Sequence, residues 1–403
     1  MARPRAGGGG GALALTVLLT AYSLAPVSPD AVGGSEQVLG ALDAALVAAG
    51  HRSLVAACEG SRVRGRLFPL GGPPGGTITD EEKRRATDRL RGAMWTAMQE
   101  ERVDLIHMHG LDFPWTLPAA GIPVLGTLHL PPGWYPEWLY ELDRPATWLN
   151  CVSGAQMAAA PAVPYMLPPV PNGVPVTALG RCRRTRDDYA VCLARVCPEK
   201  GLHLALEAAH RADVPLVLAG EVFPYEAHRS YFEAEIVPRL DGKRRYAGPV
   251  GFEAKRSLLA GARCLLVPSL APETSSLVAM EAAACGTPVI AFPAGALPEV
   301  VEHGRTGLLV GDLDEMAAAL GAGASGIGAI SPEVCRAVAR ERFSLERMTG
   351  EYLARYEVLS AGSRTMRHRP VSPGTDANSS LRATVAASTV PTLTGRREQR
   401  SGR

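Results

Sequence analysis

The sequence predicts an α/β protein built from two doubly wound domains, each with a parallel sheet covered by helices. The chain has 403 residues, which is more than one hydrophobic core ordinarily supports. Short apolar runs alternate with longer segments of helical periodicity on both sides of a proline-rich stretch, and this alternation is typical of parallel sheets. Hydrophobic residues make up 46% of the chain and charged residues 20%, as in an ordinary globular protein.

The first half contains five apolar runs that predict strands, with helices between them. The helix expected at 36–49 places Val38, Leu42 and Leu46 on one face and stops at Gly50, a residue that suits the left-handed position after a helix. A second helix is expected at 80–98. The strands are expected at 13–22, 51–56, 105–109, 124–129 and 148–153.

The first apolar run also has features of a targeting segment. Arg3 and Arg5 precede the apolar residues 12–25, as in a secretory signal. The run leads directly into Gly33 and Gly34 and then into a helical pattern, so we interpret it as the first strand of the sheet. A processed signal and a membrane anchor stay open as alternatives, although the run is shorter than the ~20 apolar residues that span a bilayer.

Prolines are concentrated in residues 161–175, and proline fixes its own φ and cannot donate to a sheet. We therefore expect a first domain at 1–170, a linker at 171–187, a second domain at 188–343, a last helix at 344–361 and a disordered tail rich in Arg, Ser and Thr at 362–403. Strands of the second domain are expected at 189–196, 216–219, 265–268, 289–292 and 308–310, with another around Tyr246.

Charge and cysteine usage exclude some classes of function. The 42 basic and 40 acidic residues nearly cancel, so no global field attracts nucleic acid. The eight cysteines are scattered, mostly inside apolar runs. They lack the close pairs of a zinc site and the density of a disulfide scaffold, which favours buried thiols in a reducing compartment.

Charged residues in the second half follow predicted strands. Arg195 ends the first of these strands and Lys200 lies at the start of the next helix, while Glu273 and Glu281 flank the turn into a later helix. Ligands of open α/β sheets bind at the carboxyl ends of strands. Arg and Lys beside a helix N-terminus suit a diphosphate, and carboxylates accept hydrogen bonds from vicinal hydroxyls. Taken alone, each pair also fits an ordinary surface ion pair or solvated helix carboxylates.

The order of these motifs resembles a known family. The stretch 267–291, continued by Gly295, 298–300 and 304–310, resembles the donor-binding half of the bacterial retaining glycosyltransferases of family 4, which have the GT-B fold. The resemblance extends to 195–201, 171–174, 33–36 and His129 and covers about residues 12–360. It implies two Rossmann-like domains that face each other across a cleft, with the last helix crossing back to the first domain.

The resemblance also implies roles for individual residues. It assigns Arg195 and Lys200 to the donor diphosphate, Glu281 to the ribose and Glu273 to the sugar. The Gly33–Gly34 turn would approach the β-phosphate, and His129 would lie near the reacting sugar, although a structural role for this histidine stays open. The implied catalytic residues are His129, Arg195, Lys200 and Glu273, and the implied donor-binding set further contains Gly33, Gly34, Ser275, Ser276, Leu277 and Glu281.

One motif departs from the family pattern. Many members carry Gly-Phe-Gly after the first of the paired glutamates, and this chain has Thr274, Ser275 and Ser276 instead. Three side chains then occupy space that glycine leaves open, so the donor sugar is not identified. For His107 and His109 we favour a structural role.

The implied activity is a hexosyl transfer with retention of configuration, from a nucleotide diphosphate sugar of the UDP or GDP type. The acceptor, a glycan, a lipid-linked saccharide or a small molecule, is not identified. No cofactor and no metal are expected. Asp312 and Asp314 match the two-aspartate pattern of metal-dependent transferases, but they open a predicted helix, where aspartates act as caps. A nucleotide-sugar epimerase on the same fold and a catalytically silent nucleotide-sugar-binding protein are the alternatives.

The expected location is the cytoplasm, with no nucleic-acid partner. Arg62, Arg64 and Arg66, together with the basic residues of 83–91, offer a surface for peripheral contact with the inner face of the membrane. Glu81 and Glu82 interrupt the second group, which favours a solvated helix face. A membrane-contacting surface and a solvated helix face are therefore both open for these residues.

Overall fold

The structure, a computed structural model, describes residues 14–73, 75–182, 184–323 and 326–367. Its strands form two sheets, and every pairing between neighbouring strands is parallel. The first sheet has the order β3-β2-β1-β4-β5-β6-β7 and the second the order β10-β9-β8-β11-β12-β13. Each sheet therefore grows outward in both directions from its first strand, which is the doubly wound arrangement that the sequence predicts.

The strands of the first sheet are β1 (Thr16–Thr20), β2 (Arg52–Ala57), β3 (Arg66–Pro69), β4 (Leu105–Met108), β5 (Val124–Leu128), β6 (Thr147–Cys151) and β7 (Met166–Leu167). Successive side chains of β1 point to opposite faces. Val17 and Leu19 pack with Leu42 of α1 (Gly34–Ala48), whereas Leu18 packs with Leu90 of α2 (Asp80–Glu100). The first apolar run thus supplies the strand between β2 and β4.

The helix α1 illustrates how local sequence sets an element. Its buried residues include Val38, Leu42 and Leu46, and the chain leaves the helix through Gly50 at a φ of 79°. Glycine adopts this left-handed conformation without a steric penalty. The expected face and the expected stop are both confirmed.

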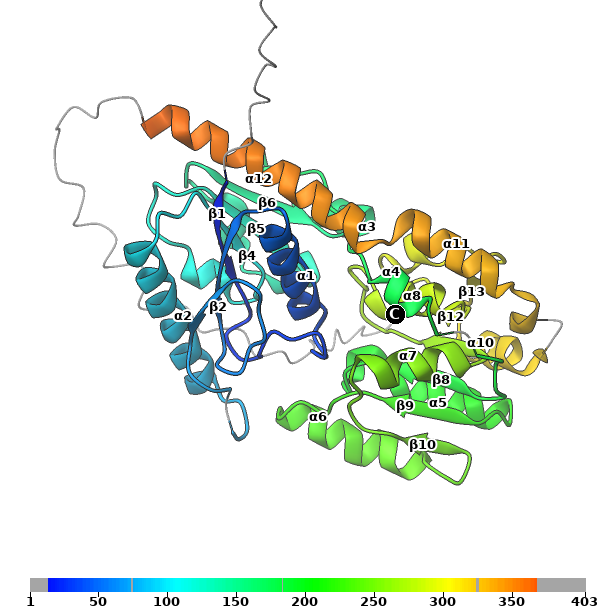
Figure 1. Cartoon of the computed structure of the whole chain (residues 1–403). Coiled ribbons are helices and arrows are strands. Elements are labelled where there is room, and N and C mark those ends of the chain that lie inside the picture. The colour runs from blue at the N-terminus through cyan, green and yellow to red at the C-terminus, as the bar shows by residue number, and fades with distance from the viewer. Residues whose placement is uncertain (1–13, 74, 183, 324–325, 368–403) are drawn as a thin grey trace, which may run out of the picture.

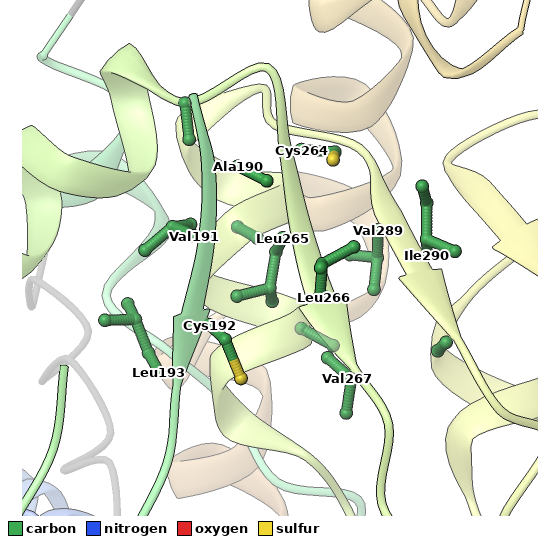
Figure 2. Close-up of a cluster of buried hydrophobic side chains, with 14 of the residues drawn as sticks. Ala190, Val191, Cys192, Leu193, Cys264, Leu265, Leu266, Val267, Val289 and Ile290 are labelled. Atoms are coloured by element: carbon green, nitrogen blue, oxygen red, sulfur yellow. The ribbon is translucent and has the colours of Figure 1, made fainter. Parts of the chain in front are cut away.

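The second domain has a continuous apolar core between its sheet and its helices (Figure 2). Its strands are β8 (Ala190–Leu193), β9 (Leu216–Ala219), β10 (Arg244–Tyr246), β11 (Cys264–Val267), β12 (Val289–Ala291) and β13 (Gly307–Leu309). Its main helices are α5 (Leu202–Arg211), α6 (Glu226–Tyr231), α7 (Phe252–Gly261), α8 (Leu277–Cys285), α10 (Leu313–Gly321) and α11 (Pro332–Arg342). All eight cysteines are free, and seven are buried.

The last helix, α12 (Leu345–Arg367), starts beside the second domain and lies along the first, next to α1 (Figure 1). Its buried side chains Tyr352 and Tyr356 pack in the apolar cluster of the first sheet. The Tyr356 hydroxyl lies 2.6 Å from Nδ1 of His107 on β4, and Nδ2 of Asn150 on β6 donates to the Tyr352 hydroxyl over 3.1 Å. The first sheet is therefore covered in part by the end of the chain.

Two segments connect the halves, and they run side by side. Val174 donates its backbone N–H to Phe343, and Leu345 donates back to Val174. Arg347 adds hydrogen bonds to the carbonyls of Pro171 and Asn172. The segment that leaves the first domain and the segment that returns to it are thus hydrogen-bonded to each other.

Several details of the sequence prediction are wrong. The strands β3 and β7 were not expected, because Pro69 and the prolines around 161–169 argue against sheet structure. The expected linker contains a short helix, α4 (Val176–Leu179). The last helix continues to Arg367 instead of ending at 361, and the remaining tail, 368–403, lies outside the described residues.

Candidate active site

Both sheets bring their polar loops to the point where the strand order reverses. In the first sheet this point lies between β1 and β4, and in the second between β8 and β11. Gly33 and Gly34 follow β1, Arg195 and Lys200 follow β8, and Glu273 follows β11. The predicted residues therefore occupy the edge at which open α/β sheets bind ligands.

Lys200 and Glu273 form an ion pair at the edge of the second sheet. The Lys200 ammonium lies 2.6 Å from Oε1 of Glu273, and the Ser269 hydroxyl donates to the same oxygen. The next residue, Gly201, has a φ of 62°, and a Cβ there would lie 2.2 Å from the Pro268 carbonyl oxygen. Only glycine lets the turn that carries Lys200 approach the loop after β11 this closely.

Electrostatics keep Glu273 ionised. Burial alone would raise the pKa of this carboxyl, but the charge and hydrogen bond of Lys200, the Ser269 hydroxyl and the charge of Arg195 outweigh burial, and the pKa is lowered. At neutral pH the site therefore holds a carboxylate with two cations near it.

Arg195 is the unpaired cation of this group. Its side chain is half-buried, and among the described residues it makes no hydrogen bond and no ion pair. The charge of Arg195 helps to lower the pKa of Glu273 in the second domain, and it opposes the burial that raises the pKa of Glu36 in the first. The guanidinium thus lies between the two sheets and is free to bind an anion.

The N-terminus of α8 contributes donors beside these charges. Ser276, which precedes the helix, has a φ of 60° and a ψ of 70°, a left-handed conformation that a residue with a Cβ rarely takes. The hydroxyl oxygens of Ser275 and Ser276 are buried and have no hydrogen-bond partner among the described residues. Ser276 thus combines a backbone conformation that favours glycine with a hydroxyl that has no partner among the described residues.

Glu281 lies inside α8 and has a different partner from Glu273. Its carboxylate is 3% exposed and forms an ion pair with Lys255 of α7. Burial raises the pKa of Glu281 and outweighs the opposing effect of Lys255. Lys255 was not predicted as a site residue, because a pair 26 residues apart on two different helices leaves no pattern in the sequence.

The Gly33–Gly34 turn lies against the second domain. A Cβ on Gly34 would be 3.1 Å from Cδ1 of Leu277, the first residue of α8. The Glu36 carboxylate folds back over the turn, and a Cβ on Gly33 would lie 1.7 Å from its Oε2. Burial raises the pKa of Glu36. The Glu36 carboxylate therefore lies over the start of α1, where backbone N–H groups attract anions.

Three histidines stand in a row at the edge of the first sheet. Nδ1 of His109 lies 2.9 Å from Nε2 of His129, and the rings of His107 and His109 are 3.9 Å apart. Burial lowers the pKa of His129 to about 4, and it holds the pKa values of His107 and His109 well below the usual value for histidine. His129 is therefore neutral at pH 7. His107 has a structural role, since Tyr356 and Thr127 occupy both of its ring nitrogens.

Other contacts join the two domains around this site. Thr274 donates its hydroxyl to the His129 carbonyl over 2.8 Å, and Asp30 accepts the backbone N–H of Phe252 at the start of α7 over 3.0 Å. The Glu299 carboxylate accepts backbone N–H groups at the start of α3 (Gly154–Ala159). None of these contacts was expected, since each depends on the relative placement of two separately folded sheets.

The aromatic residues of the loop after β5 divide between core and surface. The Tyr135 ring is buried, and its hydroxyl accepts the backbone N–H of His129 over 3.0 Å. Trp138 stacks edge-on against Trp115 and remains partly exposed. Tyr135 therefore positions the strand end that carries His129.

The basic surface of the first domain is largely neutralised. Arg62 pairs with Asp30, Arg66 with Glu100 and Glu101, and three of the cations of α2 pair with acidic residues one turn away, namely Lys83 with Asp80, Arg85 with Glu81 and Glu82, and Arg91 with Asp88. These pairs favour the solvated helix face. Over the described ranges, no helix is long and apolar enough to cross a membrane.

Two family models match the chain, one in each half. Residues 32–176 match Glycosyltransferase Family 4, and residues 187–323 match Glycosyl transferases group 1. Together the two matches take in well over half of the sequence. They meet close to the proline-rich connection between the two sheets.

Curated relatives match over shorter stretches. The chain is 34% identical over 147 residues to the D-inositol 3-phosphate glycosyltransferase of Saccharomonospora viridis, covering 34% of this chain and 33% of that protein. It is 36% identical over 186 residues to the enzyme of the same name from Mycolicibacterium paratuberculosis, covering 42% and 40%. The matched part thus spans about a third of the first relative's length.

Solved structures share the fold at low identity. Sucrose-phosphate synthase from Thermosynechococcus elongatus superimposes with a TM-score of 0.70 at 20% identity, over 86% of this chain and all of that one. Anabaena HepE in complex with UDP-glucose gives a TM-score of 0.64 at 20% identity, over 85% of this chain and all of that one. With both halves matched by family models and both sheets matched by these structures, the chain belongs to the family 4 glycosyltransferases and has the GT-B fold.

Proposed function

We propose that this protein is a retaining glycosyltransferase that takes a sugar from a nucleotide diphosphate sugar of the UDP or GDP type. The proposal rests mainly on the edge of the second sheet. There the Lys200 ammonium pairs with Glu273, the charge of Arg195 acts on the same carboxylate, and the Ser275 and Ser276 hydroxyls, which have no partner among the described residues, precede α8. Structural neighbours in complex with UDP and UDP-glucose support a donor of this class.

The diphosphate is assigned to the cationic end of this group. Arg195 offers a planar fork and Lys200 a mobile charge, and the N-terminus of α8 adds backbone N–H groups. In the first domain, next to α8, the start of α1 offers the N–H groups over which the Glu36 carboxylate lies. We assign the β-phosphate to this position, with displacement of Glu36.

The sugars are assigned to the two glutamates. Glu273 is ionised and able to accept hydrogen bonds from two hydroxyls of the transferred sugar. Glu281 is assigned to the ribose, for which Lys255 holds its carboxylate in place. The Ser275 and Ser276 hydroxyls lie between these glutamates in the sequence, and we assign them to oxygens of the sugar or the diphosphate.

Retention is explained by attack from the face that the diphosphate leaves. The bond between the anomeric carbon and the diphosphate oxygen breaks, and the acceptor oxygen bonds to the same face of that carbon. The acceptor proton passes to the departing diphosphate. This route needs no carboxylate nucleophile and no metal. It asks the protein to position both reactants and to stabilise negative charge on the leaving group.

His129 is assigned to the sugar next to the bond that breaks. Its imidazole is neutral at pH 7 because burial lowers its pKa to about 4. A neutral ring hydrogen-bonds a sugar hydroxyl without adding a positive charge beside the anomeric carbon, where positive charge develops. The hydrogen bond from Thr274 to the His129 carbonyl ties this strand end to the donor-binding loop.

The acceptor is left as a glycan, a lipid-linked saccharide or a small molecule. Because the curated relatives are named D-inositol 3-phosphate glycosyltransferases, a phosphorylated cyclitol is the first small molecule to test. Accumulation of a glycosylated product distinguishes transfer from epimerisation of the donor, which leaves a free isomeric sugar nucleotide.

A thermal-shift titration with UDP, GDP, ADP and their sugar conjugates tests the donor site. A ligand at 100 times its dissociation constant adds about 2.7 kcal/mol to the stability of the folded state. We expect a shift with UDP or GDP that Arg195→Ala abolishes and that the matched surface variant Arg305→Ala keeps. A folded sample that responds to none of these nucleotides would refute the proposal.

A further inference from the structure

A thiol, a carboxylate and an imidazole meet at the edge of the second sheet. The ligand atoms of Cys197, Glu199 and His228 all lie within 4.8 Å of one another. Cys197 and Glu199 flank Pro198 in the turn that also carries Lys200, and His228 comes from α6. Residues about 30 positions apart in the sequence thus converge at one point.

The three groups have few competing partners. Nδ1 of His228 is buried and has no hydrogen-bond partner among the described residues. The Cys197 thiol makes a long contact of 3.7 Å with the Arg195 carbonyl oxygen, and its other hydrogen-bonding neighbour is Glu199 of the same cluster. No salt bridge engages Glu199 within the described ranges. The ring of His228 is held edge-on by Tyr225, with 5.1 Å between the ring centroids. Tyr225 therefore holds the imidazole in place, while its Nδ1 has no hydrogen-bond partner among the described residues.

This combination has the chemistry of a zinc site. Thiolate, imidazole and carboxylate are the three protein ligand types that zinc takes, and three such ligands leave one tetrahedral position for water or an anion oxygen. One thiolate and one carboxylate balance the charge of a divalent cation.

We propose that Cys197, Glu199 and His228 form a binding site for a thiophilic divalent cation, for which zinc is the best chemical match. Binding replaces the thiol proton by the metal, so one proton is released for each ion bound. The ion links the turn at 197–200 to α6 and so fixes the backbone between Arg195 and Lys200. It takes no part in the transfer step, and the site does not depend on the proposed function.

Cobalt substitution tests the site directly. The full chain is stripped of metal with a chelator and titrated with Co²⁺, whose bond to a thiolate gives a near-ultraviolet charge-transfer band. We expect this band to saturate at one equivalent and to disappear when Zn²⁺ is added. Cys197→Ala removes the band, whereas the matched control Cys192→Ala, at another buried cysteine of the same domain, keeps it.

A second variant distinguishes the loss of a metal ligand from a folding defect. His228→Gln changes a half-buried ligand and is expected to weaken Co²⁺ binding by about tenfold or more, since even the loss of an outer-shell partner costs that much. Wild-type protein without a charge-transfer band would overturn the proposal. So would a band that survives Cys197→Ala, or an affinity that His228→Gln leaves unchanged.

Discussion

Replacing Ser276 by glycine is expected to stabilise the protein and to weaken donor binding at the same time. Ser276 combines a left-handed backbone with a buried hydroxyl for which the described part of the chain offers no hydrogen-bond partner. Glycine takes this backbone conformation without strain and carries no hydroxyl to desolvate. If the hydroxyl is kept for the donor, as we propose, its removal costs affinity.

The size of the gain follows from three contributions. A left-handed conformation costs a residue with a Cβ about 1–2 kcal/mol, and an unsatisfied buried hydroxyl costs about 1–3 kcal/mol. The greater freedom of glycine in the unfolded chain opposes these gains by about 0.5–1 kcal/mol. With both gains at their smallest and the opposing cost at its largest, Ser276→Gly still increases the free energy of unfolding by about 1 kcal/mol. This increase raises Tm by roughly 2–4 °C for a domain of this size.

The expected loss of affinity is of similar size. One hydrogen bond to the donor contributes about 0.5–1.5 kcal/mol, so Ser276→Gly weakens binding of the nucleotide sugar by roughly 2–10-fold. Differential scanning calorimetry gives Tm, and isothermal titration with the donor identified in the thermal-shift screen gives the affinity. Ser276→Ala, which keeps the strain and loses the hydroxyl, separates the two contributions.

Ala146 supplies the control. It too has a left-handed backbone, with a φ of 52°, but it lies at the amino end of β6, opposite the candidate site. Ala146→Gly is expected to relieve strain and leave donor affinity unchanged. If Ser276→Gly lowers Tm, the account of strain and desolvation at this residue is wrong. If it raises Tm without touching affinity, the hydroxyl does not bind the donor.

Three further outcomes are expected. Lys255→Met leaves the Glu281 carboxylate buried without its cation, and we expect urea denaturation to show a free energy of unfolding lower by about 3–5 kcal/mol. The double variant that also carries Glu281→Gln is expected to recover most of this loss. Burial raises the pKa of Asp112 from 3.8 to about 6, so the folded protein binds this proton more tightly than the unfolded chain, and the resulting stability is present below pH 4 and lost as pH rises through 6. Asp112→Asn removes this dependence, worth roughly 3 kcal/mol, in urea titrations at pH 4 and pH 7. Glu36→Gln removes a charge from the position assigned to the β-phosphate. We expect it to tighten the binding of nucleotide diphosphates a few-fold in calorimetric titrations, because the repulsion between the two negative charges costs ~1 kcal/mol.

Each of these outcomes has a clear opposite. Equal stability of Lys255→Met and the wild type would mean that Glu281 is solvated or protonated in the free protein. A pH dependence that persists in Asp112→Asn belongs to another group. Weaker diphosphate binding by Glu36→Gln would show that this carboxylate supports the donor instead of covering its site.

The sequence predicts the parts of the fold that depend on local periodicity. The face of α1 and its stop at Gly50 follow from residue spacing and glycine geometry. The short strands β3 and β7 escape prediction because they are two to four residues long and lie beside prolines. Strands of this kind form only because a neighbouring strand offers hydrogen bonds, and a local pattern does not contain that information.

The candidate site is predictable in its charges and not in its pairings. Arg195, Lys200 and the two glutamates are recognised from their order along the chain. Their partners are set by tertiary packing, as for Lys255, which reaches Glu281 from another helix. The backbone of Ser276 is a further case, since serine in a sequence gives no sign of a left-handed φ.

The last helix has a consequence for synthesis on the ribosome. Tyr352 and Tyr356 fill the cluster that α1 and the first sheet share, and they satisfy His107 and Asn150 at its base. The nascent first domain therefore exposes an apolar surface and unpaired polar groups until residues 345–360 leave the exit tunnel, after the whole second domain. A chaperone that binds apolar segments is expected to hold the nascent chain during that interval, and chains stopped at residue 343 are expected to aggregate.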